Sequence, residues 1–400
     1  MAKPVTHTVQ IIGDGMDGRW ITWRWSEALF PAGIAKTEGL NEAAAAFKAV
    51  LPQGIDEAAL RKSLRSGLAV PTAEAGIMRA LSRALLPTKL RAEIRQCHDS
   101  GARLIVRVAP PPQAAAVPWG LLFLDDELRL LDVADIAWLA PVLLRDLGHP
   151  SAPATATPDA AAGSRPLHII DPELGNEKQL FDDLSDVTAF IDGASVAERR
   201  KVTRNDLSEA LHESPTRFYF LGHCSARGTQ SDSMGMVLSD EHGDTQHPLT
   251  AGALMNDPSR WPMPSRAALV ACASGIDMAD FEPFGLATAL LNNGASLVQA
   301  ALWVLPTDHA LKALGQARRR PFLSLACAID AAQCAYDPVA HLNAWQRARL
   351  AEWRAAPPDK LSIDDSPLLW GAAMTMIAPS RQLTRDGPLA HHTVGTTAQR

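Results

Sequence analysis

Two hydrophobic patterns follow one another in the first hundred residues. Apolar and polar residues alternate over 8–12 and 20–25, on either side of a glycine-rich stretch, which predicts a β-hairpin. Apolar residues then recur at three- and four-residue spacing, which predicts helices, before a short apolar run that predicts a strand. The predicted helices span 38–50, 56–66, 73–86 and 88–100, and the strand spans 104–108. This section is expected to form a small α+β unit.

From residue 165 onward, short β-rich apolar runs alternate with amphipathic segments. The predicted strands are 167–170, 217–221, 235–238, 267–271 and 296–301, and the predicted helices are 177–190, 204–212, 250–255 and 285–292. Such alternation is typical of a mostly parallel sheet with helices on both faces. The fold class predicted for the whole chain is therefore α/β, preceded by the small α+β unit.

Composition shifts suggest the domain boundaries. Residues 150–165 lack any large apolar side chain and are rich in Pro and Ala, which predicts a loop. Residues 380–400 are polar without periodicity, which predicts a loosely held tail. We therefore expect an N-terminal regulatory or interaction domain over 1–100, a second domain over 101–379 that contains the loop, and the tail.

Charge and cysteine content narrow the function classes. Among 400 residues there are 38 Lys and Arg against 44 Asp and Glu, a net charge of −6, which argues against nucleic acid or anionic lipid as the main partner. The longest apolar stretches, such as 367–379, are shorter than the roughly 20 residues of a membrane span, so a cytoplasmic protein without a span is expected. The five cysteines form no C-x-x-C pair, and His391 and His392 have no ligand cluster nearby, so we expect no metal and no cofactor.

A G-x-G-x-x-G sequence is present but does not predict a dinucleotide site. It consists of Gly13, Gly15 and Gly18 and lies after a strand. The dinucleotide motif requires a helix to follow, whereas the residues that follow here alternate as a strand, and Asp14 and Asp17 would repel phosphates. A hairpin turn is the favoured interpretation, and a P-loop sequence is absent.

A histidine and a cysteine each follow an apolar strand. The strand 217–221 leads into His223, and the strand 267–271 leads into Cys272. Residues beyond the carboxyl ends of parallel strands line the ligand crevice, so neighbouring strands would bring the two side chains together. An imidazole lowers the pKa of a thiol, and the thiolate is the nucleophile. The separation, 272 − 223 = 49 residues, agrees with the histidine about 50 residues upstream in caspase-type proteases.

Several segments in the same order extend this pattern over 104–379. They are PWGLL at 118–122, LGH at 221–223, LVACASG at 269–275, GLA at 285–287, NGA at 293–295, LWVLP at 302–306 and PLLWGA at 367–372. Together they resemble the CHAT family, the caspase-like cysteine peptidases related to separase. The resemblance implies a caspase-like fold and hydrolysis of peptide bonds in a protein substrate.

The resemblance also implies roles for single residues. His223 is expected to be the general base or imidazolium partner, and Cys272 the nucleophile that forms a thioester. The backbone N–H groups of Cys224 and Cys272 are the expected oxyanion donors. Cys224 stands where the family commonly has glycine, so its side chain either narrows the pocket or is simply packed.

Two further segments, 281–285 and 302–309, resemble separase, whose substrates present arginine at the cleaved position. A carboxylate in the specificity pocket would pair with that guanidinium. Asp308 is the first candidate, and Asp277, Asp280 and Glu282 are the alternatives. Acidic residues after a strand are also common in solvated loops, so that alternative stays open.

The expected function is a cysteine endopeptidase gated by its N-terminal unit or by a regulatory protein partner, since family members occur in bacterial defence and cell-death modules. The alternative is a catalytically silent caspase-like scaffold in which residues 1–100 bind a partner. A nucleotide-binding enzyme is a distant third, because no phosphate loop supports it.

Overall fold

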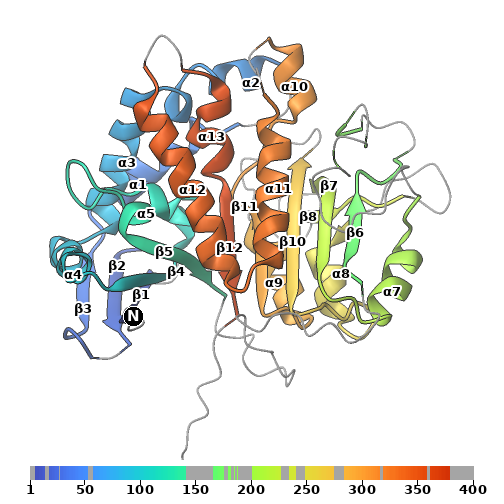
Figure 1. Ribbon diagram of the computed structural model, residues 1–400, viewed down its shortest axis with the longest axis horizontal. Helices are drawn as coiled ribbons and strands as arrows, with labels where there is room; N and C mark the ends of the chain where they lie inside the picture. Colours follow the sequence, from blue (N-terminus) through green and yellow to red (C-terminus); the bar gives the residue numbers. More distant parts are fainter. Residues whose placement is uncertain are drawn as a thin grey trace, which may run out of the picture.

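The computed structural model describes residues 5–13, 18–26, 28–52, 57–140, 165–174, 179–181, 184, 187, 201–226, 234–239, 248–273, 283–315, 319–357 and 361–378. Within these residues one twelve-stranded mixed sheet runs through the molecule in the order β3-β2-β1-β4-β5-β12-β11-β10-β7-β8-β9, and β6 also pairs with β7 (Figure 1). The strands are β1 Thr6–Gly13, β2 Trp20–Trp25, β3 Gly33–Lys36, β4 Arg103–Ala109, β5 Ala134–Leu139, β6 Leu167–Ile170, β7 Phe218–Ala226, β8 Met234–Met236, β9 Leu249–Thr250, β10 Arg266–Ala273, β11 Leu297–Ala301 and β12 Ala373–Ile377.

The sheet contains two parallel blocks that run in opposite directions. Strands β1, β4, β5 and β12 are parallel to one another, and so are β11, β10, β7 and β6. The blocks meet at the antiparallel pair β11 and β12. The carboxyl ends of the two blocks therefore lie at opposite edges of the sheet, and only one edge carries the ends of β7 and β10.

Helices cover both faces of the sheet. On one face lie α11 and α12: the Gln333 amide of α11 donates to Gln299 Oε1 of β11 (2.9 Å), and the Asn343 amide of α12 donates to the Ile136 carbonyl of β5 (3.2 Å). On the opposite face, α4 contacts β2 through hydrogen bonds from two tryptophans of β2 to Glu93 of α4. The helices are α1 Leu40–Lys48, α2 Glu57–Ser63, α3 Pro71–Leu85, α4 Thr88–Asp99, α5 Leu130–Val133, α7 Arg204–His212, α8 Ala251–Asn256, α9 Pro283–Asn292, α10 Asp308–Ala313, α11 Pro321–Cys334, α12 Pro338–Ala355 and α13 Pro367–Trp370.

The alternation of β2 decides which of its side chains are buried. Trp23 and Trp25 share the covered face, where both indole N–H groups donate to the Glu93 carboxylate (2.8 and 2.9 Å). Trp20 lies on the opposite face of the ribbon and is 37% exposed. The tryptophans at 23 and 25 thus serve packing.

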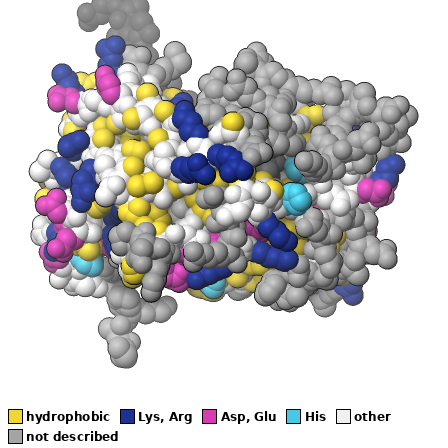
Figure 2. All heavy atoms as spheres, turned by 90° about the horizontal axis from the view of Figure 1, so that it is seen from above, with side chains coloured by type: hydrophobic (Ala, Val, Ile, Leu, Met, Phe, Trp, Pro, Cys, Tyr) yellow, Lys and Arg dark blue, Asp and Glu magenta, His cyan; other side chains and the backbone are white. Residues whose placement is uncertain are grey.

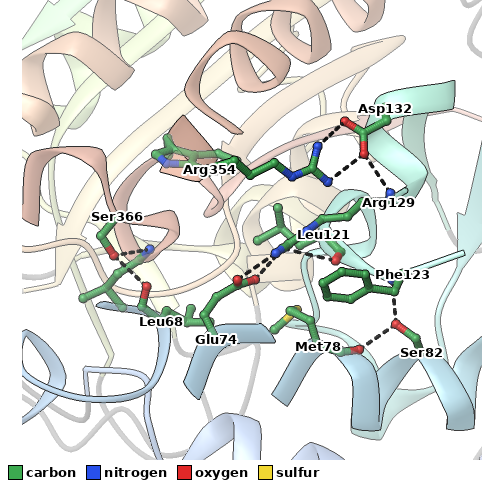
Figure 3. A network of polar contacts seen from close by, with 12 residues as sticks. Leu68, Glu74, Met78, Ser82, Leu121, Phe123, Arg129, Asp132, Arg354 and Ser366 are labelled. Atoms are coloured by element: carbon green, nitrogen blue, oxygen red, sulfur yellow. Dashed lines mark hydrogen bonds and ion pairs between the residues drawn. The ribbon is translucent and has the colours of Figure 1, made fainter. Parts of the chain in front are cut away.

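A partly buried polar network ties the N-terminal helices to the rest of the fold (Figure 3). The Arg129 guanidinium makes a bidentate ion pair with Glu74 of α3. Ser366 Oγ donates to the Leu68 carbonyl (2.9 Å), and Arg354 of α12 pairs with Asp132. Residues before position 100 therefore share one interior with residues after it.

The structure confirms the predicted fold class and most predicted elements. The hairpin forms with Val9 opposite Trp25, and the helices predicted from 38 to 100 lie within a few residues of their expected ends. Strand β1 pairs with β4, so the sheet crosses the expected boundary near residue 100, and that division stays a prediction. Most of the predicted helix 177–190 and nearly all of the loop 150–165 and the tail 380–400 lie outside the described residues.

Candidate active site

The structure brings the two candidate catalytic positions together. Strands β7 and β10 are neighbours and parallel, and their register pairs His223 with Cys272. Neighbouring strands lie about 4.8 Å apart, and paired positions fall on the same face of a sheet. Cys224 follows His223 directly and therefore falls on the opposite face. The register thus selects position 272 over position 224 as the partner of the histidine.

His223 lies in a part of β7 that is paired with β10. It is 6% exposed, and its carbonyl accepts a hydrogen bond from the Val237 N–H (2.9 Å). Before it, a Cβ added at Gly222 would lie 2.5 Å from the Phe220 ring, so only glycine fits there without moving that ring. The position of His223 is therefore fixed by strand pairing and by close packing.

Helix α11 lies on the same face of the sheet as His223. Tyr219 of β7 donates its hydroxyl hydrogen to the Ala326 carbonyl of α11 (2.8 Å), and Tyr219 is four residues before His223, so the two share a face. At the other end of α11, Arg266 at the start of β10 donates to the carbonyl of Gln333 (2.6 Å). The N-terminus of α11 therefore points toward the edge of the sheet where β7 and β10 end.

Both strands are longer than the sequence pattern predicts. The expected strands end at residues 221 and 271, whereas β7 continues to Ala226 and β10 to Ala273, because their last residues still pair. His223 and Cys272 therefore lie among the last paired residues of their strands, and not beyond the strand ends. Cys224 lies opposite both Met236 of β8 and Ala273 of β10.

The location of Cys224 bears on its two expected roles. Its side chain is buried, as a small packed residue would be. Its backbone lies between two paired strands, where N–H groups ordinarily serve the sheet. The role of the Cys224 and Cys272 backbone N–H groups as oxyanion donors stays a prediction.

Asp308 lies at the N-terminus of α11. Its carboxylate oxygens accept hydrogen bonds from the Phe322 N–H (2.9 Å) and the Leu323 N–H (3.0 Å). Burial raises the pKa of Asp308 to about 6, although these two hydrogen bonds act in the opposite direction. The carboxyl group is thus near the edge that carries the candidate site, and its role in binding arginine stays a prediction. The alternatives Asp277, Asp280 and Glu282 lie outside the described residues.

Two other described thiols, those of Cys97 and Cys327, are not activated. Burial raises the pKa of Cys97 and of Cys327 to about 11, and a nearby carboxylate adds to the effect in each case. Cys334 is exposed at the end of α11. Neither Cys97 nor Cys327 has the depressed pKa that a nucleophilic cysteine requires.

A second polar cluster, which the sequence pattern does not predict, lies beneath α11. Asp330 of α11 accepts from Arg217, at the start of β7, and lies 3.2 Å from His168 Nε2 of β6. Burial raises the pKa of Asp330, but the hydrogen bonds from His168 and Arg217 outweigh it, so the pKa lies below its usual range. An arginine at the start of a strand flanked by aromatic residues was the only sequence signal for this cluster. It anchors α11 to the strand that carries His223.

Figure 2 shows the end of the molecule that lies uppermost in Figure 1. Hydrophobic side chains gather on one side of this surface, and Lys and Arg side chains gather near its middle.

Within the described ranges, no three His, Cys, Asp or Glu side chains are placed to hold a metal ion. No helix in the same ranges combines the length and the apolar character needed to cross a membrane.

A mixed α/β sheet with histidine and cysteine at paired positions near the ends of two parallel strands defines a caspase-like architecture. The family model for the CHAT domain matches residues 76–378, most of the chain. The chain therefore belongs to the CHAT-domain family. No curated protein sequence matches it.

Among solved structures, the Saccharomyces cerevisiae separase–securin complex is similar to this chain at 9% identity, with a TM-score of 0.49. The similarity covers 94% of this chain and 30% of the separase complex chain, so the protein spans less than a third of that chain's length.

Proposed function

We propose that the protein is a cysteine endopeptidase in which His223 and Cys272 form the catalytic dyad. The single observation that carries the proposal is the register of β7 and β10, which places the two residues opposite each other in neighbouring parallel strands. Family membership supports the same chemistry. The register also disfavours Cys224 as the nucleophile, because successive side chains of a strand point to opposite faces and Cys224 directly follows His223.

The reaction follows ordinary thiol chemistry. The imidazole of His223 takes the proton of the Cys272 thiol, and the thiolate attacks the carbonyl carbon of the scissile peptide bond. The tetrahedral intermediate collapses as the C–N bond breaks, the amine leaves with the proton from the imidazolium, and a thioester remains. Water, deprotonated by His223, then hydrolyses the thioester and regenerates the thiol.

The finer features of the proposal concern substrate and control. Substrates are proteins, with arginine before the cleaved bond and Asp308 as its carboxylate partner. A regulatory protein partner gates the activity in a bacterial defence or cell-death module. The placement of Asp308 near the edge where β7 and β10 end supports the first point, and family resemblance supports the second.

The test measures cleavage of a fluorogenic peptide library with Arg, Lys or Ala before the reporter. Wild-type protein is compared with Cys272→Ala, His223→Ala and the control Cys334→Ala, which removes an exposed thiol on α11. We expect the first two variants to lose activity by roughly a thousandfold or more and the control to keep it. Turnover that survives in both Cys272→Ala and His223→Ala would exclude this dyad.

A latent enzyme needs a second readout. An arginyl peptide vinyl sulfone labels an activated thiol covalently, and mass spectrometry locates the labelled residue. Labelling of Cys272 that requires His223 supports the peptidase even when turnover is low. A Cys272 that is no more reactive than a free thiol, with and without cell extract, would instead support the silent scaffold.

A further inference from the structure

Over β3, β2, β1 and β4, one face of the sheet carries no helix among the residues that the structure describes. The side chains of Ala137 and Thr375 lie under α12, as shown by Gln299, which bonds both Thr375 and the Pro338 carbonyl. The register pairs Ala137 with Arg107, Arg107 with Gln10 and Gln10 with Arg24, so these positions continue the same face beyond α12. Among the described residues, no helix covers this continuation, which we call the open face.

The open face carries exposed apolar side chains close to one another. Ile12 is paired with Thr22, and Thr22 with Ile34, so one row crosses three strands. Ile12 is 39% exposed and Ile34 64% exposed, and Trp20 lies on the next row of the same face. A cavity of about 640 Å³ adjoins this end of the face, lined in part by Trp20 and Lys36. Grouped exposure of this kind marks an interaction surface.

All charged residues at the strand positions of the open face are basic, whereas the adjoining cavity is also lined by Glu38 and Glu42. Arg24 donates to Gln10 Oε1 (2.9 Å), and Lys36 lies over the Trp20 ring (5.5 Å). Within the described part of the chain, neither Arg24 nor Arg107 forms an ion pair, and the strand positions of this face include no Asp or Glu. Arg107 is half buried, and burial lowers its pKa, so an added carboxylate would be especially favourable there.

The dimensions fit one helix. Helices on a sheet lie about 10 Å from their neighbours, which equals two strand spacings of about 4.8 Å. Since α12 lies over β5 and β12, the uncovered strands β4, β1, β2 and β3 span about 14 Å, and a helix about 10 to 12 Å across that lies over β1 and β2 reaches positions on β4 and β3. The β-strands here are long enough to support about four helical turns.

We propose that the open face binds an acidic amphipathic helix from a protein partner, which completes the layer beside α12. Its apolar side chains cover Ile12 and Ile34, and its carboxylates pair with Arg24, Lys36 and Arg107. The occupant is argued from charge complementarity and from the missing layer. The proposal does not depend on whether His223 and Cys272 are catalytic.

The test places a photo-crosslinking amino acid, p-benzoylphenylalanine, at position 34 in the full chain, expressed in its native cells. The same residue at position 336 is the control, since Tyr336 is also a highly exposed large side chain. Mass spectrometry sequences the peptide joined to each position. We expect position 34 to capture a segment of another protein that has apolar residues at helical spacing and flanking Asp or Glu.

Charge reversal keeps the test decisive. The pair Arg24→Glu and Lys36→Glu should lower capture at position 34 roughly tenfold, whereas Arg83→Glu, an exposed cation on α3, should leave it unchanged. Circular dichroism confirms that each variant is folded. Capture of a second copy, capture of this chain's own residues, capture unaffected by the reversal, or no capture above position 336 would each overturn the proposal.

Discussion

Replacing Glu74 by alanine should destabilise the whole protein, because it leaves a buried guanidinium without its counter-ion. Glu74 is fully buried and Arg129 is 4% exposed. The second bond of the bidentate pair joins Arg129 to Glu74 at 2.8 Å, and the guanidinium carbon lies 4.3 Å from the Phe123 ring centroid (Figure 3). Among the described residues, no other carboxylate pairs with the Arg129 guanidinium.

The magnitude follows from the difference between breaking and deleting a buried ion pair. Removing one partner typically costs about 3 to 5 kcal/mol, because the other charge stays buried. Replacing both partners by apolar side chains of similar size is often close to neutral. We therefore expect Glu74→Ala to cost about 3 to 5 kcal/mol and the double variant Glu74→Met with Arg129→Met to cost no more than about 2 kcal/mol.

The assay is urea unfolding followed by tryptophan fluorescence, with Glu42→Ala in the exposed first turn of α1 as the control. The control should change the free energy of unfolding by less than about 0.5 kcal/mol. A Glu74→Ala variant within about 1 kcal/mol of wild type would refute the reasoning, because it would mean that Arg129 reaches water or another anion in the folded protein.

Three further predictions concern individual side chains. Glu93→Ala should cost about 2 kcal/mol in the same urea assay, because two buried indole N–H groups lose their acceptor; an unchanged midpoint would contradict it. Burial raises the pKa of Asp308 from 3.8 to about 6 in the folded state, so between these two pH values the folded protein keeps the proton that the unfolded chain has lost. The free energy of unfolding should therefore fall by at most about 3 kcal/mol as the pH rises from about 3.8 to about 6. Asp308→Asn should remove this decline, and a parallel decline in both proteins would show that another group causes it. Iodoacetamide at neutral pH should label Cys334 but neither Cys97 nor Cys327 until the protein unfolds, as peptide mass mapping will show.

Periodicity predicted the elements that are buried on one side. In β2 every second residue is buried, and in α3 the apolar positions recur with the helical period, so both were predictable from sequence. Strands β5 and β12 are buried on both faces, and their residues show no alternation that marks them as strands. Their existence became evident only when the sheet was complete.

The order of the strands in the sheet was harder to predict from the sequence than the strands themselves. Strand β12 comes from the end of the described chain and lies between β5 and β11, which are separated from it by long stretches of sequence. Local patterns carry no information on such pairings, because any buried apolar strand satisfies the same rule. The same limit applied to Asp308, whose carboxylate was expected to face solvent or substrate but also caps α11.

The site was more predictable than the sheet order, because both candidate residues lie near the ends of apolar strands, and among the described residues only β8, β9 and α8 lie between those strands in the chain. Their register is now part of the sheet itself: seven consecutive pairs join β7 to β10, and His223 with Cys272 is one of them. A gate on the proposed peptidase would therefore act on substrate access to the site or on the orientation of the two side chains. Separating the two backbone positions would require breaking the pairing of β7 with β10.

The helix layer offers a contiguous route for such a gate. A partner on the open face would lie beside α12, whose N-cap Asp337 pairs with Arg103 of β4 (2.7 Å). Helix α12 packs against α11, and α11 covers the face of the sheet that carries His223, with Asp308 at its N-terminus. Binding at one end of the sheet and chemistry at the other would thus share a single layer of helices, which is where a coupling between them would have to act.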